Sequence, residues 1–160
     1  MDKVKVSDKL LLSVEKPARY TGGELNSIVK ETARLRFALC FPDVYEIGMS
    51  HLGSRILYEV INSREEYACE RCFAPWPDME KAMRENNVPM FTLETRTPLA
   101  ECDIVGFSLL YEMCYTNILT MLDLAHIHKR SADRGENEPI IVAGGGCACN
   151  PEPIADFMDA

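Results

Sequence analysis

The chain has 160 residues, 47% of them hydrophobic, which is enough for one globular domain with a buried core. A formal net charge of -8 offers no basic surface for a phosphate backbone, so nucleic-acid binding by this chain alone is disfavoured. The longest apolar runs fall short of the roughly 20 residues that a membrane span needs, and no signal-peptide core follows the charged start. We therefore expect a cytoplasmic protein without membrane contacts.

The first 34 residues are mixed and polar, and proline and glycine punctuate the stretch KPARYTGGELN. This composition predicts an N-terminal arm over residues 1–34 rather than an element of the core. Apolar runs typical of strands and helices begin at Leu35, and we assign residues 35–160 to one domain.

The first strand and helix follow the arm. LRFALCF, at 35–41, is continuously apolar between Arg36 and Pro42 and predicts a strand covered on both faces. A helix is expected within residues 50–63, where five apolar residues recur at the spacing of one helical face: Leu52, Ile56, Leu57, Val60 and Ile61.

A second strand is expected within EYACERCFAPW, at 66–76. Asp78 can then cap a short helix over 79–87 that turns Met79, Ala82 and Met83 inward. Residues 90–93 predict a short edge strand.

The second half repeats this alternation. CDIVGFSLL, at 102–110, predicts a buried strand, and EPIIVAGGG, at 138–146, predicts a fourth. The helix expected between them, within 115–130, places on one face Ile118, Leu119, Leu122, Ala125 and His126. A further helix is expected to start near Pro151 or Pro153. Because the chain stops inside it, we expect a piece of a longer protein, whose next strand pairs beside 138–146.

Strands and helices that alternate over short connections imply right-handed crossovers and a parallel sheet. We therefore predict an α/β fold, a flavodoxin-like (Rossmann-like) doubly wound parallel sheet of four to five strands. Such sheets bind ligands at the carboxyl ends of the strands. Three loops qualify by position: those after Phe41 and after Leu110, and residues 144–146.

Glycines at 144–146 permit close approach of a ligand to the main chain, although a strand-to-helix turn also uses glycine. Classical nucleotide binding is disfavoured, since PDVYEIGMSHLG follows the first strand where a dinucleotide fingerprint would read G-x-G-x-x-G.

Seven cysteines, an odd number mostly within apolar runs, indicate buried thiols rather than disulfides. Cys69 with Cys72 and Cys147 with Cys149 have the spacing of metal ligands. A metal site is disfavoured, because residues three apart on a strand point to opposite faces. For His51 we expect a surface or helix-start role, and His126 and His128 lie near a helix end.

Taken together, the motifs of the three loops resemble those of a known protein family. The chain resembles the cobalamin-binding domain that precedes the catalytic barrel in many radical S-adenosylmethionine (SAM) proteins, with motifs D-x-H-x-x-G, S-x-L and G-G after strands one, three and four. The corresponding letters here are DVYEIG at 43–48, SLL at 108–110 and GG at 144–145. VEKPARYTGGELN, FPDVYEIGMSHLG, LLYEMCYTN and GGGCACNPEPIADF look like the amino-terminal region of one uncharacterised branch of those enzymes.

The resemblance implies a cobalamin site made by seven residues: Asp43, Tyr45, Gly48, Ser108, Leu110, Gly144 and Gly145. In the family the histidine of the first motif ligates cobalt, but Tyr45 stands at that position here. A neutral phenol is a poor ligand beside imidazole. Either a corrinoid binds without a protein ligand to cobalt, or the fold persists with its pocket filled or reused.

The resemblance also implies a partner, a downstream radical SAM domain of the same polypeptide. Its 4Fe-4S cluster and S-adenosylmethionine belong there, since no C-x-x-x-C-x-x-C run occurs in this chain. No turnover is expected of this chain alone. Two alternatives to a corrinoid module stay open: a vestigial scaffold that positions the downstream domain, and a flavin or nucleotide module, which the acidic first loop disfavours.

Overall fold

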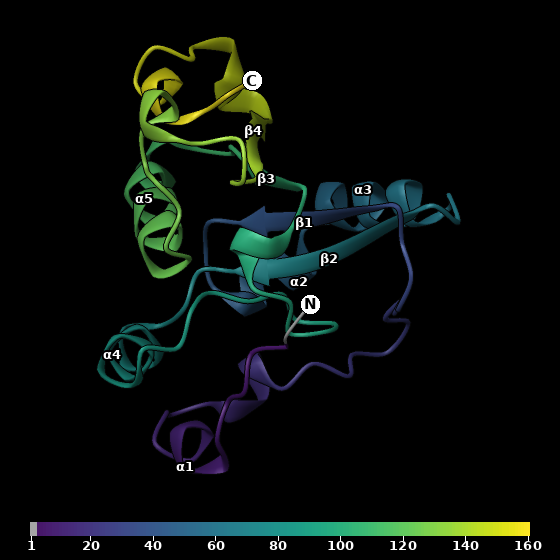
Figure 1. Cartoon of the computed structure of the whole chain (residues 1–160), viewed down its shortest axis with the longest axis vertical. Coiled ribbons are helices and arrows are strands. Elements are labelled where there is room, and N and C mark those ends of the chain that lie inside the picture. Colours follow the sequence, from purple (N-terminus) through teal and green to yellow (C-terminus); the bar gives the residue numbers. More distant parts are fainter. Residues whose placement is uncertain (1–2) are drawn as a thin grey trace.

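A computed structural model describes residues 3–160, and within them four parallel strands form one sheet (Figure 1). The strands are β1 (Leu35–Phe41), β2 (Tyr67–Phe73), β3 (Ile104–Ser108) and β4 (Ile140–Gly144), and the spatial order is β2-β1-β3-β4. The chain leaves β1 to one side for β2 and returns to its other side for β3, so the strand order reverses between β1 and β3. This arrangement confirms the predicted flavodoxin-like α/β sheet.

Helices cover both faces of the sheet (Figure 1). Helix α3 (Leu52–Asn62) packs on one face, and α4 (Pro77–Asn86) and α5 (Tyr115–Leu124) pack on the other. Two helices are short, α1 (Asp8–Leu11) and α2 (Tyr45–Ser50). Single 3-10 turns occupy Pro17–Tyr20, Leu99–Glu101, Glu112–Cys114, Ser131–Asp133, Gly146–Cys149 and Ala155–Phe157.

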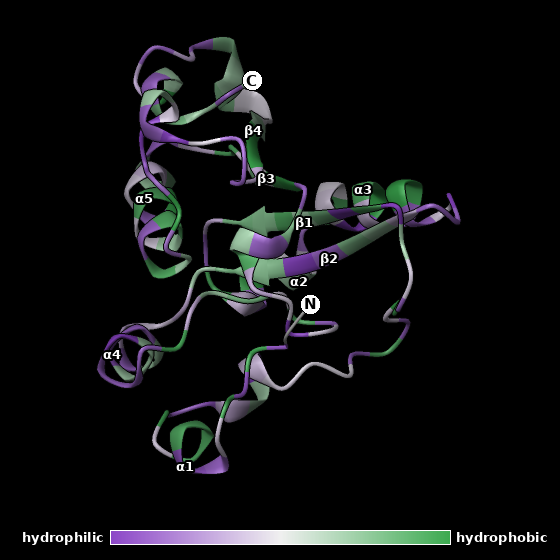
Figure 2. Cartoon of the chain, viewed as in Figure 1, coloured by the Kyte–Doolittle hydropathy of each residue, from purple (hydrophilic) through white to green (hydrophobic). Residues whose placement is uncertain are grey.

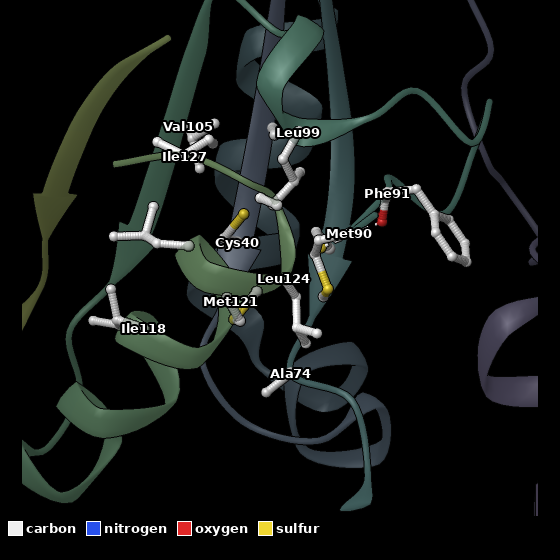
Figure 3. Close-up of a cluster of buried hydrophobic side chains, with 14 of the residues drawn as sticks. Cys40, Ala74, Met90, Phe91, Leu99, Val105, Ile118, Met121, Leu124 and Ile127 are labelled. Carbon is white, nitrogen blue, oxygen red and sulfur yellow. Dashed lines mark hydrogen bonds between the residues drawn. The ribbon is translucent and has the colours of Figure 1, made fainter. Parts of the chain in front are cut away.

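The main core lies on the α4 and α5 face, where Figure 3 shows side chains from β1, β3 and α5 converging. Cys40, Val105, Ile118 and Met121 are fully buried there. The inward residues predicted for α4 are confirmed, since Met79, Ala82 and Met83 are all buried. Alternate residues of β1 and β2 face α3 instead and form a smaller cluster around Leu39, Tyr58 and Cys69.

The arm contributes to the main core, which its polar composition did not predict. Val4, Val6, Leu10 and Val14 are buried in it, and the Val4 N–H donates to the Arg96 carbonyl over 2.8 Å. Apolar residues spaced along an otherwise polar stretch are therefore enough to fix the arm against the domain.

A polar stretch, Glu70 and Arg71, interrupts the hydrophobic strand β2 (Figure 2). Glu70 is buried, pairs with the guanidinium of Arg36 and accepts a hydrogen bond from Thr95 Oγ1 over 2.5 Å. The loop that contains Thr92 and Thr95 folds around this carboxylate instead of forming a strand. The prediction of an edge strand at 90–93 is therefore wrong. A single bridge between Phe91 and Pro98 is all the β pairing found in this loop.

Four of the five residues predicted to form the buried apolar face of α3 are exposed instead, while the fifth, Ile61, packs against the cluster around Tyr58. Leu52, Ile56, Leu57 and Val60 are between 47% and 66% exposed. The helix packs through Ser54, Tyr58 and Asn62 instead, and the Asn62 amide exchanges two 3.0 Å hydrogen bonds with the backbone of Cys69. These polar anchors to β2 fix the rotation of α3 and leave the four exposed residues outward.

Three boundaries also differ from the expectation. Trp76, not Asp78, is the N-cap of α4, because Pro77 takes the first helical position. Helix α5 ends before His126, which has a left-handed backbone (φ 58°). After the turn at Ala155–Phe157 no helix develops, and Asp159 and Ala160 hydrogen-bond to the backbone of β4 over 2.7 and 3.0 Å.

Candidate functional site

A groove of about 400 Å³ opens on the α3 face of the sheet and runs from the middle of β1, β3 and β4 to the carboxyl ends of β3 and β4. This is the size of a small-molecule site and the place where a doubly wound sheet binds ligands. Its walls are almost entirely apolar or glycine: Phe37, Leu39, Gly53, Leu57, Gly106, Phe107, Leu110, Val142, Ala143, Gly144 and Gly145, joined by His51 and Ser108.

Four of the seven residues expected at the site line this groove, namely Ser108, Leu110, Gly144 and Gly145. They come from the ends of β3 and β4, which are neighbours in the sheet. The three residues of the first loop, Asp43, Tyr45 and Gly48, do not line it.

Gly144 and Gly145, at the end of β4, are glycine for different structural reasons. Gly145 has a φ of +127°, and a Cβ there would lie 2.5 Å from the Leu109 carbonyl oxygen. The turn therefore needs glycine at 145. At Gly144 a Cβ would meet nothing within 4 Å, so this position leaves open space at the mouth of the groove.

The groove floor is also shaped by glycine. A Cβ on Gly106 would approach the Phe37 ring to 2.4 Å. The absence of a side chain at the centre of β3 lets this ring lie across the sheet and keeps the floor apolar.

Tyr45 lies away from the groove, in the first turn of α2. Its ring packs edge-on against Phe73 with 5.5 Å between centroids, and its hydroxyl donates to Glu24 Oε1 over 3.2 Å. Burial, followed by the charge of Glu24, raises the pKa of the Tyr45 phenol. Tyr45 instead lines a small cavity of about 30 Å³, together with Arg19 and Arg71.

Gly48 is a packing residue of α2. It is buried, and a Cβ there would lie 2.3 Å from the Phe73 ring. Helix α2 therefore sits close against the end of β2, which keeps the first loop on that side of the sheet.

Asp43 joins the loop after β1 to the loop after β3. Its Oδ1 accepts a 2.7 Å hydrogen bond from the Val44 N–H, and its Oδ2 accepts from the Tyr111 hydroxyl. This second bond is the largest cause that raises the pKa of Tyr111 to about 12. Asn117, in the first turn of α5, donates from its amide to the Pro42 carbonyl over 2.9 Å, so the loop after β1 is also held to α5.

His51 is the groove residue that the motif comparison missed. It caps α3, since its Nδ1 accepts from the Ser54 N–H over 3.1 Å, which confirms the helix-start role expected for it. Its ring packs 5.2 Å from that of Phe41, and a Cβ on Gly53 would lie 2.8 Å from its Cε1. The sequence S-H-L-G at 50–53 indicates this role. His51 is the capping residue, and Gly53 has no side chain that would collide with its ring.

Cys40 and Cys72 are register neighbours on β1 and β2 and lie in the main core, but Cys69 lies apart from them. Cys69 faces the α3 cluster and Cys72 the main core, as expected for residues three apart on a strand. Burial is the main cause that raises the pKa of Cys69 to about 12, and likewise that of Cys102. Among residues 3–160 no group of three or more His, Cys, Asp or Glu side chains is placed to hold a metal ion.

Comparison with known protein families identifies a match. A family model described as "Radical SAM proteins, N-terminal" matches residues 53–160, which is more than half of the chain. No curated protein and no solved structure matches it. Within the described residues, no helix is both long enough and apolar enough to pass through a membrane.

Proposed function

Because the chain belongs to the family of N-terminal domains of radical SAM proteins, we propose that it is the accessory corrinoid-binding module of such a protein. The family implies a radical SAM domain in the same polypeptide. We assign the 4Fe-4S cluster and S-adenosylmethionine to that domain, and the corrinoid to the groove beside β1, β3 and β4.

The groove is the observation that carries this proposal. It lies next to the point where strand order reverses, it is open, and its lining is apolar apart from His51 and Ser108. The nucleotide tail of a corrinoid, an aromatic base on a flexible arm, matches such a lining. All four of Ser108, Leu110, Gly144 and Gly145 line the groove. In this proposal Ser108 bonds the tail, Leu110 lines its path, and the two glycines let it pass.

The residues also fit a corrinoid without a protein ligand to cobalt. Tyr45 is engaged by Glu24 and Phe73, outside the groove. His51 lies in the groove, but its Nδ1 is occupied by the cap of α3. A bound corrinoid supplies cobalt to radical or group-transfer chemistry, while this chain's residues hold its tail and exclude water from it.

A second candidate function rests on a different observation. The outward apolar stripe of α3, formed by Leu52, Ile56, Leu57 and Val60, favours a scaffold that positions the radical SAM domain. The scaffold alternative further requires side chains such as Tyr45 or Met49 to fill the groove. Neither side chain lines it, and Met49 Sδ instead accepts from Arg71 over 3.4 Å.

Titration of the chain with hydroxocobalamin, followed in the visible spectrum, tests the proposal. We expect saturable binding at micromolar ligand, and weaker binding of cobinamide, which keeps the corrin ring but lacks the nucleotide tail. Absence of binding at high micromolar hydroxocobalamin would argue for the scaffold.

A further inference from the structure

The cap of α3 determines which nitrogen of His51 carries the proton. A neutral imidazole has one donor and one acceptor nitrogen. Nδ1 accepts from the Ser54 N–H over 3.1 Å and lies 2.9 Å from Ser54 Oγ, so the proton belongs on Nε2. Nε2 is therefore an N–H donor, which cannot ligate a metal ion in this tautomer.

His51, which carries this donor, and Ser108 are the two residues with polar side chains among those that line the groove. No residue among 3–160 hydrogen-bonds to Nε2 of His51 or to the hydroxyl of Ser108. The remaining lining is apolar side chains and glycine. A ligand that fills the groove must satisfy these groups, because buried donors without a partner lose the hydrogen bonds that water gave them.

The ring of His51 is also held in place. It packs against Phe41 at 5.2 Å between centroids, and the missing side chain of Gly53 leaves the space that its Cε1 occupies. The donor is thus preorganised by α3 and β1 before any ligand arrives, which reduces the cost of ordering on binding.

We infer that His51 is a specificity residue of the groove, where its Nε2–H donates to an acceptor atom of a flat heteroaromatic ligand. This inference rests on the proposed function, and it names the class of group that the groove takes. The preferred ligand is an aromatic base with an unprotonated ring nitrogen, which presents apolar faces to the groove walls and an acceptor to His51. An aromatic ring of the same shape without that acceptor leaves the donor unpaired.

A matched pair of probes tests the donor. 1,5,6-Trimethylbenzimidazole offers a ring-nitrogen acceptor, whereas 1,5,6-trimethylindole has nearly the same shape and none. In a calorimetric or NMR titration we expect the chain to bind the benzimidazole about fivefold more tightly, the value of one net hydrogen bond. His51→Ser keeps an N-cap for α3 but removes the ring, and should reduce this preference to less than twofold.

The tautomer is measured separately on the ligand-free chain. In a two-bond proton–nitrogen NMR correlation, neutral His51 should show the pattern of an Nε2–H imidazole. A pattern with the proton on Nδ1 would overturn the inference, as would equal binding of both probes or an unchanged preference in His51→Ser. If hydroxocobalamin binds while the probes bind equally, only this inference fails; if neither hydroxocobalamin nor the probes bind, the proposed function fails with it.

Discussion

The aromatic residue that lines the groove is not the one at the histidine position of the motif. Tyr45, at the histidine position, is turned toward Glu24 and Phe73, and His51, six positions later, lies in the groove. The cause is α2, which inserts a short helix between β1 and α3. The groove is therefore faced by the start of α3, and the motif letters alone do not locate its residues.

A second feature at the residue scale is the hydrogen bond from the Tyr111 hydroxyl to Asp43, which joins two loops beside the groove. Tyrosine has a pKa near 10 in an unfolded chain, and this bond raises it to about 12 in the folded chain. The stabilisation is fully present below pH 10 and is lost as the pH rises through 12.

Tyr111→Phe should therefore lower the free energy of unfolding at pH 8, and the difference from wild type should vanish near pH 12. Urea unfolding at both pH values checks this, with Tyr67→Phe, at an exposed tyrosine of β2, as the control. A stability loss in Tyr111→Phe that is the same at pH 8 and pH 12 would show that the hydrogen bond is not its cause.

At the scale of elements, α3 shows why an apolar stripe is not always a core face. Amphipathic helices usually bury such a stripe. Here Asn62 bonds the backbone of Cys69 on both sides, and the Tyr58 hydroxyl accepts from the Ile28 N–H over 2.7 Å. These directional bonds to β2 and the arm determine the rotation of the helix.

Substitutions on the two faces of α3 should differ sharply. Ile56→Gln and Val60→Gln remove exposed side chains and should each change the free energy of unfolding by less than about 0.5 kcal/mol. Tyr58→Ala removes a buried ring and its hydrogen bond and should cost about 3 kcal/mol or more. Urea denaturation measures all three; equal costs on both faces would mean that the stripe is buried in solution.

The strands were predictable from the sequence because short continuous apolar runs such as FALCF, at 37–41, are typical of strands that are buried on both faces. The helix α4 followed equally from its spacing. The loop around Glu70 was not predictable, because a buried carboxylate satisfied by Arg36 and Thr95 depends on contacts distant in sequence. The burial of the arm was not predictable for the same reason, since Val4 is buried only through contacts made across the fold.

The candidate site was half predictable. The residues after β3 and β4 followed from the rule that ligands lie at strand ends, and Ser108 and Gly144 do line the groove. Which residue after β1 lines the groove could not be predicted from the sequence motif, because α2 lies between β1 and α3 and brings His51 there instead of Tyr45. Only the register of α3, set by its anchors to β2, brings His51 there.

For the whole molecule, the two faces of the sheet have different roles. The α4 and α5 face carries the main core and, with the buried arm, holds the fold together (Figure 1). The α3 face carries a small cluster, an open groove and an exposed apolar stripe. Ligand binding and contact with the radical SAM domain both belong on this second face in our account.

The most direct test of this account is to fill the groove without disturbing the fold. Gly144→Val adds a side chain where a Cβ meets nothing within 4 Å, and Gly135→Val does the same in a loop that does not line the groove. In titrations with hydroxocobalamin, we predict that Gly144→Val weakens binding at least about tenfold, the loss of roughly 1.4 kcal/mol, while Gly135→Val binds like wild type. Equal affinity of the two variants would contradict the claim that the groove is the binding site.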